Sequence, residues 1–181
     1  MQNKKRIIVG LQGAAAAGKT AVARKLSKKL TGKTARISVD VLRDMSCLNT
    51  MTLKQSDEYI TMAKKVALNL TKSYLNEGCD NVIIEFAPPV TANKGAADKW
   101  LAQNLKKIGG CVFLLHTSLP TVIKRNKNRR GEFGQGNLPR KLVEKIYRDY
   151  EKYIDKKDFE VIETDKIGAD KTSSVILEKI V

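Results

Sequence analysis

Residues 13–20 read GAAAAGKT, and they directly follow the apolar run Arg6–Gln12 (RIIVGLQ). The stretch satisfies the pattern GxxxxGK[ST], which holds nucleotide phosphates when it joins a strand to a helix. Small residues let backbone N–H groups turn inward around phosphate oxygens, and the following helix directs its positive N-terminal end at them. The run 6–12 is typical of a buried strand, and residues 21–30 have helical apolar spacing. The sequence therefore predicts a phosphate-binding loop here, made of Gly13, Ala14, Ala15, Ala16, Ala17, Gly18, Lys19 and Thr20.

The last two residues of this loop suit a nucleoside triphosphate with Mg²⁺. A lysine at position 19 can reach the β- and γ-phosphates, and the hydroxyl of Thr20 can ligate the metal. The alternative is a turn rich in small residues that binds nothing. Ala16 stands where many such loops have glycine, which leaves the backbone fewer conformations at that point.

Apolar runs and helical patterns alternate along the rest of the chain. Further strands are expected at residues 35–40, 81–86, 111–116 and 159–163. Helices are expected at residues 57–76, 92–107, 119–128, 139–153 and 169–181. Short strands separated by helices indicate a parallel sheet covered on both faces. We therefore expect an α/β fold, a single doubly wound five-stranded parallel sheet. It would form one domain over residues 1–181.

The composition is that of an ordinary globular protein, but the charge is strongly positive. Lys and Arg number 34 against 19 Asp and Glu, a formal net charge of +15. The excess lies in residues 1–36 and 121–153. It indicates either a solvated lysine-rich surface or a polyanionic ligand such as a nucleic acid. Few aromatic residues accompany these bases, which weakens the second interpretation.

Cysteine and histidine usage argues against a metal or disulfide framework. The three cysteines, at positions 47, 79 and 111, form no CxxC pair, and His116 is the one histidine. A structural role is expected for that histidine. This pattern favours a reducing cytoplasm. The apolar runs are too short to span a bilayer, so no membrane partner is expected.

The chain lacks the marks of several nucleotide-binding classes. Asn93-Lys94 and Asn126-Lys127 lack the aspartate with which GTPases read the base. Motor and transport ATPases usually end an apolar strand in an acid, whereas the run 111–116 ends in His116. Of the central strands only 81–86 carries a carboxylate, Glu85. A small phosphotransferase is the class that remains.

Three further motifs accompany the loop. Asp40-Val41-Leu42-Arg43 ends the second expected strand, Val82-Ile83-Ile84-Glu85 forms the third, and residues 123–131 read IKRNKNRRG. With these motifs the sequence resembles the small P-loop kinases: polynucleotide kinases, zeta-type toxins, chloramphenicol phosphotransferase and related predicted AAA-domain kinases. The stretch around Glu85 departs from the aspartate-containing motif of polynucleotide kinases.

The resemblance implies a P-loop NTPase fold of the nucleotide-kinase type and roles for these residues. Asp40 would receive the proton of the acceptor hydroxyl, and Arg43 would hold a phosphate of the acceptor. Glu85 would act at the metal or the acceptor. A lid around residues 125–137 would close on ATP through Arg125 or Arg129. The implied cofactors are ATP and Mg²⁺.

Each of these residues also has an ordinary structural interpretation. Asp40 can cap the helix that follows it. Arg43 can pair with Asp44, and Glu85 with a buried base. The lid arginines can be solvated charge on a basic surface.

The sequence thus predicts an ATP-dependent kinase that transfers the γ-phosphate to a hydroxyl. Candidate acceptors are a small metabolite, a nucleoside or nucleotide sugar, and a nucleic acid 5′ end. The alternative is a nucleotide-dependent switch or slow NTPase that binds nucleic acid. The sequence does not identify the acceptor, whether GTP can replace ATP, or the oligomeric state.

Overall fold

The computed structural model describes residues 6–45, 53–86, 96–128, 137–153 and 156–181. Its strands are β1 (Ile7–Gln12), β2 (Thr34–Ser38), β3 (Asn81–Phe86), β4 (Cys111–His116) and β5 (Glu160–Glu163). Its helices are α1 (Lys19–Lys29), α2 (Val39–Met45), α3 (Leu53–Asn76), α4 (Ala96–Lys107), α5 (Leu119–Lys127), α6 (Arg140–Tyr153), α7 (Ala169–Ile180) and the short η2 (Lys156–Asp158).

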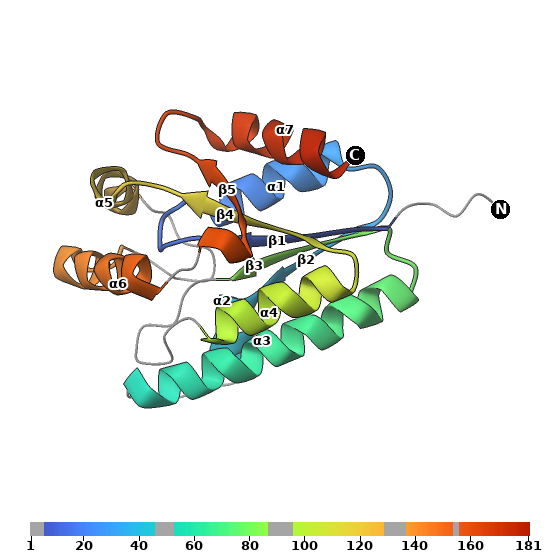
Figure 1. The fold of residues 1–181 in the computed structure, drawn as a ribbon, viewed down its shortest axis with the longest axis horizontal. Coiled ribbons are helices and arrows are strands. Elements are labelled where there is room, and N and C mark those ends of the chain that lie inside the picture. Colours follow the sequence, from blue (N-terminus) through green and yellow to red (C-terminus); the bar gives the residue numbers. More distant parts are fainter. Residues whose placement is uncertain (1–5, 46–52, 87–95, 129–136, 154–155) are drawn as a thin grey trace.

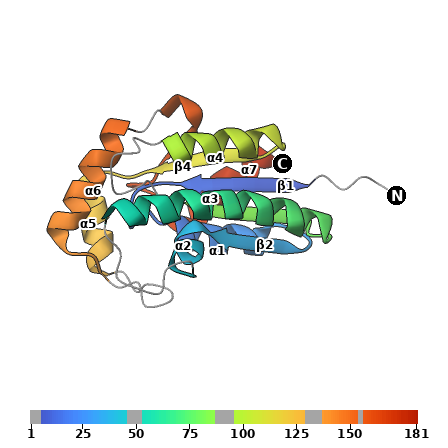
Figure 2. The same cartoon turned by 90° about the horizontal axis from the view of Figure 1, so that it is seen from below.

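The strands form one parallel sheet in the order β2-β3-β1-β4-β5. Helices α1 and α7 cover one face, and α3 and α4 cover the other (Figure 1). Helices α5 and α6 lie beyond the carboxyl ends of the strands, as Figure 2 also shows. Strands β2 and β3 lie on one side of β1, and β4 and β5 lie on the other side. In folds with such a switch in strand order, ligands bind at the carboxyl edge of the sheet beside the switch. The α/β class and the doubly wound parallel sheet are confirmed.

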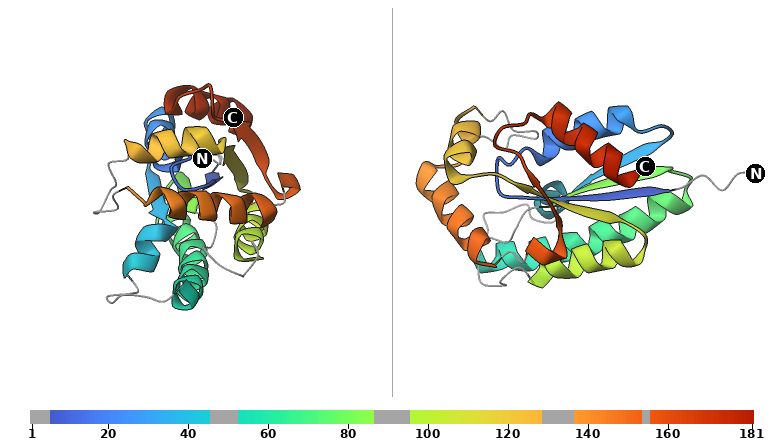
Figure 3. Two further views of the ribbon diagram at one scale, coloured as in Figure 1. Left: turned by 90° about the vertical axis from the view of Figure 1, so that its left-hand side faces the viewer. Right: turned by 45° about the horizontal axis from the view of Figure 1, so that its top comes forward.

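The core lies in two layers, one on each side of the sheet. Alternate strand residues point to opposite faces, so Ile8 and Phe86 pack toward α3 and α4 while Leu11 and Phe113 pack toward α1 and α7. Strand β3 is buried along its whole length, as expected for a central strand of a parallel sheet. Figure 3 shows the two helical layers, α1 with α7 and α3 with α4, on opposite sides of the sheet.

The strands predicted at 81–86 and 111–116 have the expected bounds, but the second strand is shorter than predicted. It ends at Ser38, which pairs with Glu85 in the last register position shared with β3. Asp40 therefore lies in the first turn of α2 and not at a strand end. The Ser38 hydroxyl accepts a hydrogen bond from the Val41 backbone N–H at 3.5 Å. Ser38, not Asp40, makes the observed capping contact.

Among the described residues, no helix combines the length and the apolar character that crossing a bilayer requires.

Candidate functional site

The loop between β1 and α1 lies at the carboxyl edge of the sheet, where β1 ends. Gly18 caps α1 in a left-handed conformation, with φ of 100°, and no side-chain hydrogen bond caps the helix. The first turn of α1 carries no acidic residue. The positive end of the helix is therefore open to an anionic ligand.

Two positions show how closely the backbone constrains this loop. A Cβ atom on Gly13 would lie 2.8 Å from the backbone oxygen of Leu115, so only glycine fits between loop and β4. Ala16 has φ of 60°, a left-handed conformation that costs an L-residue free energy. The alanine singled out in the sequence is therefore strained.

We expect opposite effects from Ala16→Gly and Gly13→Ala. The first should raise the free energy of unfolding by about 1 kcal/mol, because glycine adopts positive φ without a steric penalty. The second should lower it by about 1–3 kcal/mol through overpacking and weaken nucleotide binding. Urea unfolding and ATP titration measure both quantities. Gly168→Ala, where an added Cβ meets nothing within 4 Å, is the matched control. Equal stability of the two loop variants would contradict this account.

Lys19 begins α1 and folds back over the loop. Its ammonium donates hydrogen bonds to the backbone oxygens of Gly13, at 2.8 Å, and Ala14, at 3.1 Å. These carbonyl contacts hold the positive charge at the mouth of the loop.

The next residue of α1 connects the loop to β3. The Thr20 hydroxyl donates to Oε2 of Glu85 at 2.6 Å, and Nε of Arg36 lies 3.4 Å from Oε1 of the same carboxylate. Glu85 is 4% exposed. The structure thus brings Glu85 to the phosphate loop and also gives it the basic partner of the ordinary interpretation. The sequence did not point to Arg36 as a site residue. Its one signal there is a basic residue within an apolar strand.

Asp40 and Arg43 lie together on α2, but Arg43 is heavily engaged. Its Nη1 is 3.6 Å from Oδ1 of Asp40. Its Nε and Nη2 donate to Oδ1 of Asp44 at 2.9 and 2.6 Å. The pairing of Arg43 with Asp44, open as an alternative in the sequence, is what the structure shows. It leaves the Arg43 charge neutralised.

Arg125, near the end of α5, reaches the phosphate loop from the opposite side. Its Nη1 donates to the Ala17 backbone oxygen at 3.2 Å, and its Nη2 donates to the Thr164 backbone oxygen at 2.5 Å. The lid predicted around residues 125–137 is described only at its two ends, and Arg129 lies outside the described residues.

Sequence reasoning also missed a buried polar cluster under α3 and α4. Nζ of Lys64 lies 2.7 Å from Oδ1 of Asp98. Close by, the Tyr150 hydroxyl donates to Oε1 of Gln12 at 3.3 Å. Burial raises the pKa of Asp98 above its ordinary value, and the charge of Lys64 offsets part of that rise. Burial likewise raises the pKa of Tyr150. The signal in the sequence was faint, because Lys64 stands beside Lys65 and looks like ordinary charge on the surface of a helix.

A family of AAA domains matches residues 8–153 of this sequence. The chain belongs to this family. No curated protein matches the sequence.

Solved structures similar to this AAA domain include kinases and a resistance protein. Shikimate kinase from Acinetobacter baumannii, solved with shikimate, has a TM-score of 0.64 and 21% identity, covering 98% of this chain and 94% of that one. The tunicamycin resistance protein of Deinococcus radiodurans has a TM-score of 0.67 and 18% identity, covering 97% and 95%. Deoxyadenosine kinase from M. mycoides, with bound dATP, has a TM-score of 0.61 and 18% identity, covering 96% and 98%. At these identities the likeness establishes the fold, that of the P-loop nucleotide kinases.

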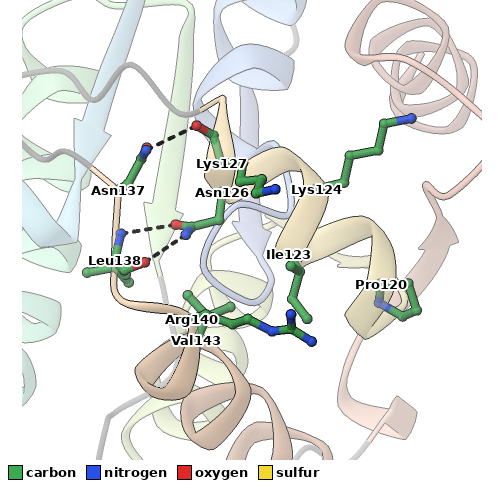
Figure 4. A pocket seen from close by; sticks show the side chains of 9 residues that line it. All are labelled: Pro120, Ile123, Lys124, Asn126, Lys127, Asn137, Leu138, Arg140 and Val143. Atoms are coloured by element: carbon green, nitrogen blue, oxygen red, sulfur yellow. Dashed lines mark hydrogen bonds between the residues drawn. The ribbon is translucent and has the colours of Figure 1, made fainter.

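The AAA domain also has a groove of about 420 Å³ between α5 and α6 (Figure 4). Ile123 and Val143 contribute apolar surface to it, and Lys124 and Lys127 contribute charge. Asn126 fixes one wall through two hydrogen bonds with the backbone of Leu138. None of its lining residues belongs to the phosphate loop, but Asn126, Lys127 and Asn137 fall within the predicted lid range 125–137.

His116 fits the structural role expected for it. Its Nδ1 lies 2.7 Å from Oε2 of Glu163 on β5, and its Nε2 lies 3.2 Å from Oε1 of Glu151 on α6. The imidazole thereby joins the sheet to α6.

Proposed function

We propose that this AAA domain is an ATP-dependent kinase that transfers the γ-phosphate to a hydroxyl acceptor. One observation carries the proposal: the Thr20 hydroxyl and the Glu85 carboxylate meet at 2.6 Å beside the phosphate loop. A phosphate cradle with oxygen ligands at its edge is the arrangement that phosphoryl transfer needs. The proposed unit is one domain over residues 1–181, with a lid at 125–137.

The oxygen atoms of Thr20 and Glu85 fit Mg²⁺, which prefers hydroxyl, carboxylate and phosphate oxygens. When bound there with ATP, the ion neutralises phosphate charge. The contact with the partly exposed Arg36 helps keep Glu85 in place.

The residues of this chain would bind the phosphates, accept the proton and orient the acceptor. Loop N–H groups and the end of α1 bind the phosphates, and Lys19 exchanges its carbonyl contacts for phosphate oxygens. Asp40 receives the proton of the acceptor hydroxyl as the new oxygen–phosphorus bond forms and the bond to ADP breaks. Arg125, which lies beside the loop, and Arg129 would neutralise charge on the transferring phosphoryl group. In this proposal Arg43 orients the acceptor through Asp40.

The acceptor class is proposed as a hydroxyl compound: a small metabolite, a nucleoside or nucleotide sugar, or a nucleic acid 5′ end. One similar structure is a kinase solved with shikimate, a hydroxyl compound, and another is a kinase solved with dATP, a nucleotide; they support a hydroxyl acceptor and a nucleotide-binding site. Free thiols at Cys79 and Cys111 suit the reducing cytoplasm that we propose as its compartment.

The test is ADP formation from ATP and Mg²⁺ with a panel of hydroxyl acceptors, followed by detection of the phosphorylated product. We expect one acceptor class to raise ADP formation at least about 100-fold above the acceptor-free rate, the scale on which acid–base groups act. ADP formation stimulated by nucleic acid without phosphorylation of it would favour the switch instead. No stimulation by any acceptor would count against the kinase.

A further inference from the structure

Arg36 brings a positive charge to the carboxylate that faces the phosphate loop. It lies on the edge strand β2, where Ser38 is the register partner of Glu85 on β3. Alternate residues of a strand share a face, so Arg36 points to the same side of the sheet as Ser38 and Glu85. Nε of Arg36 lies 3.4 Å from Oε1 of Glu85. The pairing of two strands therefore places this contact.

The two oxygen atoms of the Glu85 carboxylate face different partners. Oε2 accepts the hydrogen bond of the Thr20 hydroxyl at 2.6 Å, whereas Oε1 faces Arg36. A carboxylate attracts a cation through its negative charge, and a guanidinium at this distance offsets that charge. In the unliganded protein, Arg36 is therefore a cation that balances Glu85.

The two partners differ in how deeply they are buried. The side chain of Glu85 is 4% exposed, and that of Arg36 is 26% exposed. A buried carboxylate needs a compensating charge because it has lost its hydration. An arginine at the edge of a sheet can turn its charged end to water when another cation takes its place. The pair is therefore suited to the exchange of one cation for another.

The proposed metal site is opposed by positive charge until phosphates arrive. Mg²⁺ requires an octahedron of oxygen ligands, which in phosphoryl-transfer enzymes come from one or two carboxylates, the phosphates and water. Lys19 begins α1 beside Thr20, and the first turn of that helix carries no acidic residue. A divalent cation that arrives without phosphates is therefore repelled by both Lys19 and Arg36.

Resting on the proposed function, we propose that Arg36 competes with the divalent cation for Glu85 and so makes metal binding depend on the nucleotide. Without nucleotide, Arg36 offsets the charge of the carboxylate. The triphosphate supplies negative charge and further oxygen ligands, and Arg36 then gives up Glu85 and turns to solvent. Arg36 acts through Glu85 and touches neither substrate, so it is a positioning residue and not a catalytic one.

The test is Mn²⁺ binding to the nucleotide-free protein, measured by electron paramagnetic resonance. Arg36→Met removes the charge and keeps much of the length of the side chain. We expect this variant to bind Mn²⁺ at least about 10-fold more tightly than the wild type, because a repelling charge close to the metal is lost. Arg36→Lys keeps the charge and should bind Mn²⁺ as weakly as the wild type. Glu85→Gln added to Arg36→Met should abolish the gain.

Thermal unfolding with and without Mg²⁺ separates this role from a merely structural one. Without metal, Arg36→Met should unfold at a lower temperature than the wild type, because Glu85 stays buried and loses a balancing cation. Mg²⁺ should restore part of that loss, since a ligand that binds the folded protein stabilises it. A contact that only holds β2 to β3 predicts the same loss without recovery by Mg²⁺.

Lys33→Met is the matched control. Lys33 is exposed and directly precedes β2, so the variant removes the same charge from the same edge of the sheet. It should change the affinity for Mn²⁺ by less than about 2-fold, because exposed charges are screened by water and salt. Arg36→Gln, also uncharged, is the second variant should Arg36→Met not fold.

Unchanged or weaker Mn²⁺ binding by the folded, uncharged Arg36 variant would overturn the inference. An equal gain in Lys33→Met, or a gain that persists with Glu85→Gln, would overturn it as well. Because no nucleotide is present, these results are independent of phosphoryl transfer. Tighter Mn²⁺ binding by Arg36→Met, without transfer of phosphate to any acceptor by the wild type, would instead refute the proposed kinase alone.

Discussion

Asp40→Asn is expected to lower the rate of phosphoryl transfer by about 10²–10⁴-fold, the range for loss of a general base. Asparagine keeps the shape of the side chain but cannot take the proton of the acceptor hydroxyl. The affinity for ATP should not change, because Asp40 lies on α2 at the end of β2, and β3 separates that strand from β1. The measurement is kcat with the acceptor found in the panel, together with a separate ATP titration.

Glu77→Gln is the control for this prediction. Glu77 follows α3 at the opposite edge of the sheet and is exposed, so its loss should change kcat by less than about 2-fold. A fall in ATP affinity equal to the fall in kcat would show that Asp40 supports the phosphate loop. An unchanged kcat would remove Asp40 from the mechanism.

Lys19→Met is expected to lower phosphoryl transfer by about 10²–10³-fold, as when one preorganised donor to a developing charge is removed. It should also weaken ATP binding, because the ammonium sits at the mouth of the loop, 2.8 Å from the Gly13 backbone oxygen. The unliganded protein should lose little stability, since the lost contacts are two hydrogen bonds to backbone oxygens of the same loop. Product formation and thermal unfolding measure the two effects.

Lys25→Met makes the same change on the same helix at an exposed position. It should leave both ATP affinity and turnover within about 2-fold of the wild type, since exposed substitutions rarely matter. Similar losses in both variants would mean that the overall positive charge of α1 binds ATP, with no special part for Lys19. Full activity of Lys19→Met would contradict the assignment of the loop.

The candidate site was predictable to the extent that its residues adjoin one another in sequence. The phosphate loop is local, so its pattern and the strand before it sufficed. Glu85 was a candidate because it is the one acid in an apolar strand, but its meeting with Thr20 depends on the parallel pairing of β1 with β3. Residues Arg36, Lys64 and Asp98 escaped notice because each looks ordinary in its own segment.

Helix α3 shows why burial could not be read from the sequence. Its apolar spacing at positions 59, 62, 66, 70 and 74 predicted the helix. In the structure, Met62, Val66 and Tyr74 are about 40% exposed, at 41%, 39% and 40%, whereas Ile60, Ala63 and Ala67 are buried. Two stripes of the helix are apolar, and the choice between them depends on how the helix docks on the sheet.

By itself the sequence determined what short-range chemistry controls: the alternation of strands and helices, the parallel sheet, and a loop whose small residues can wrap a phosphate. The tertiary structure decided which distant side chains meet. It paired Arg43 with Asp44, linked Thr20 to Glu85, and buried Lys64 against Asp98. The physical reason is that backbone patterns repeat over a few residues, whereas electrostatics and desolvation act between atoms that only the folded chain brings within a few ångströms.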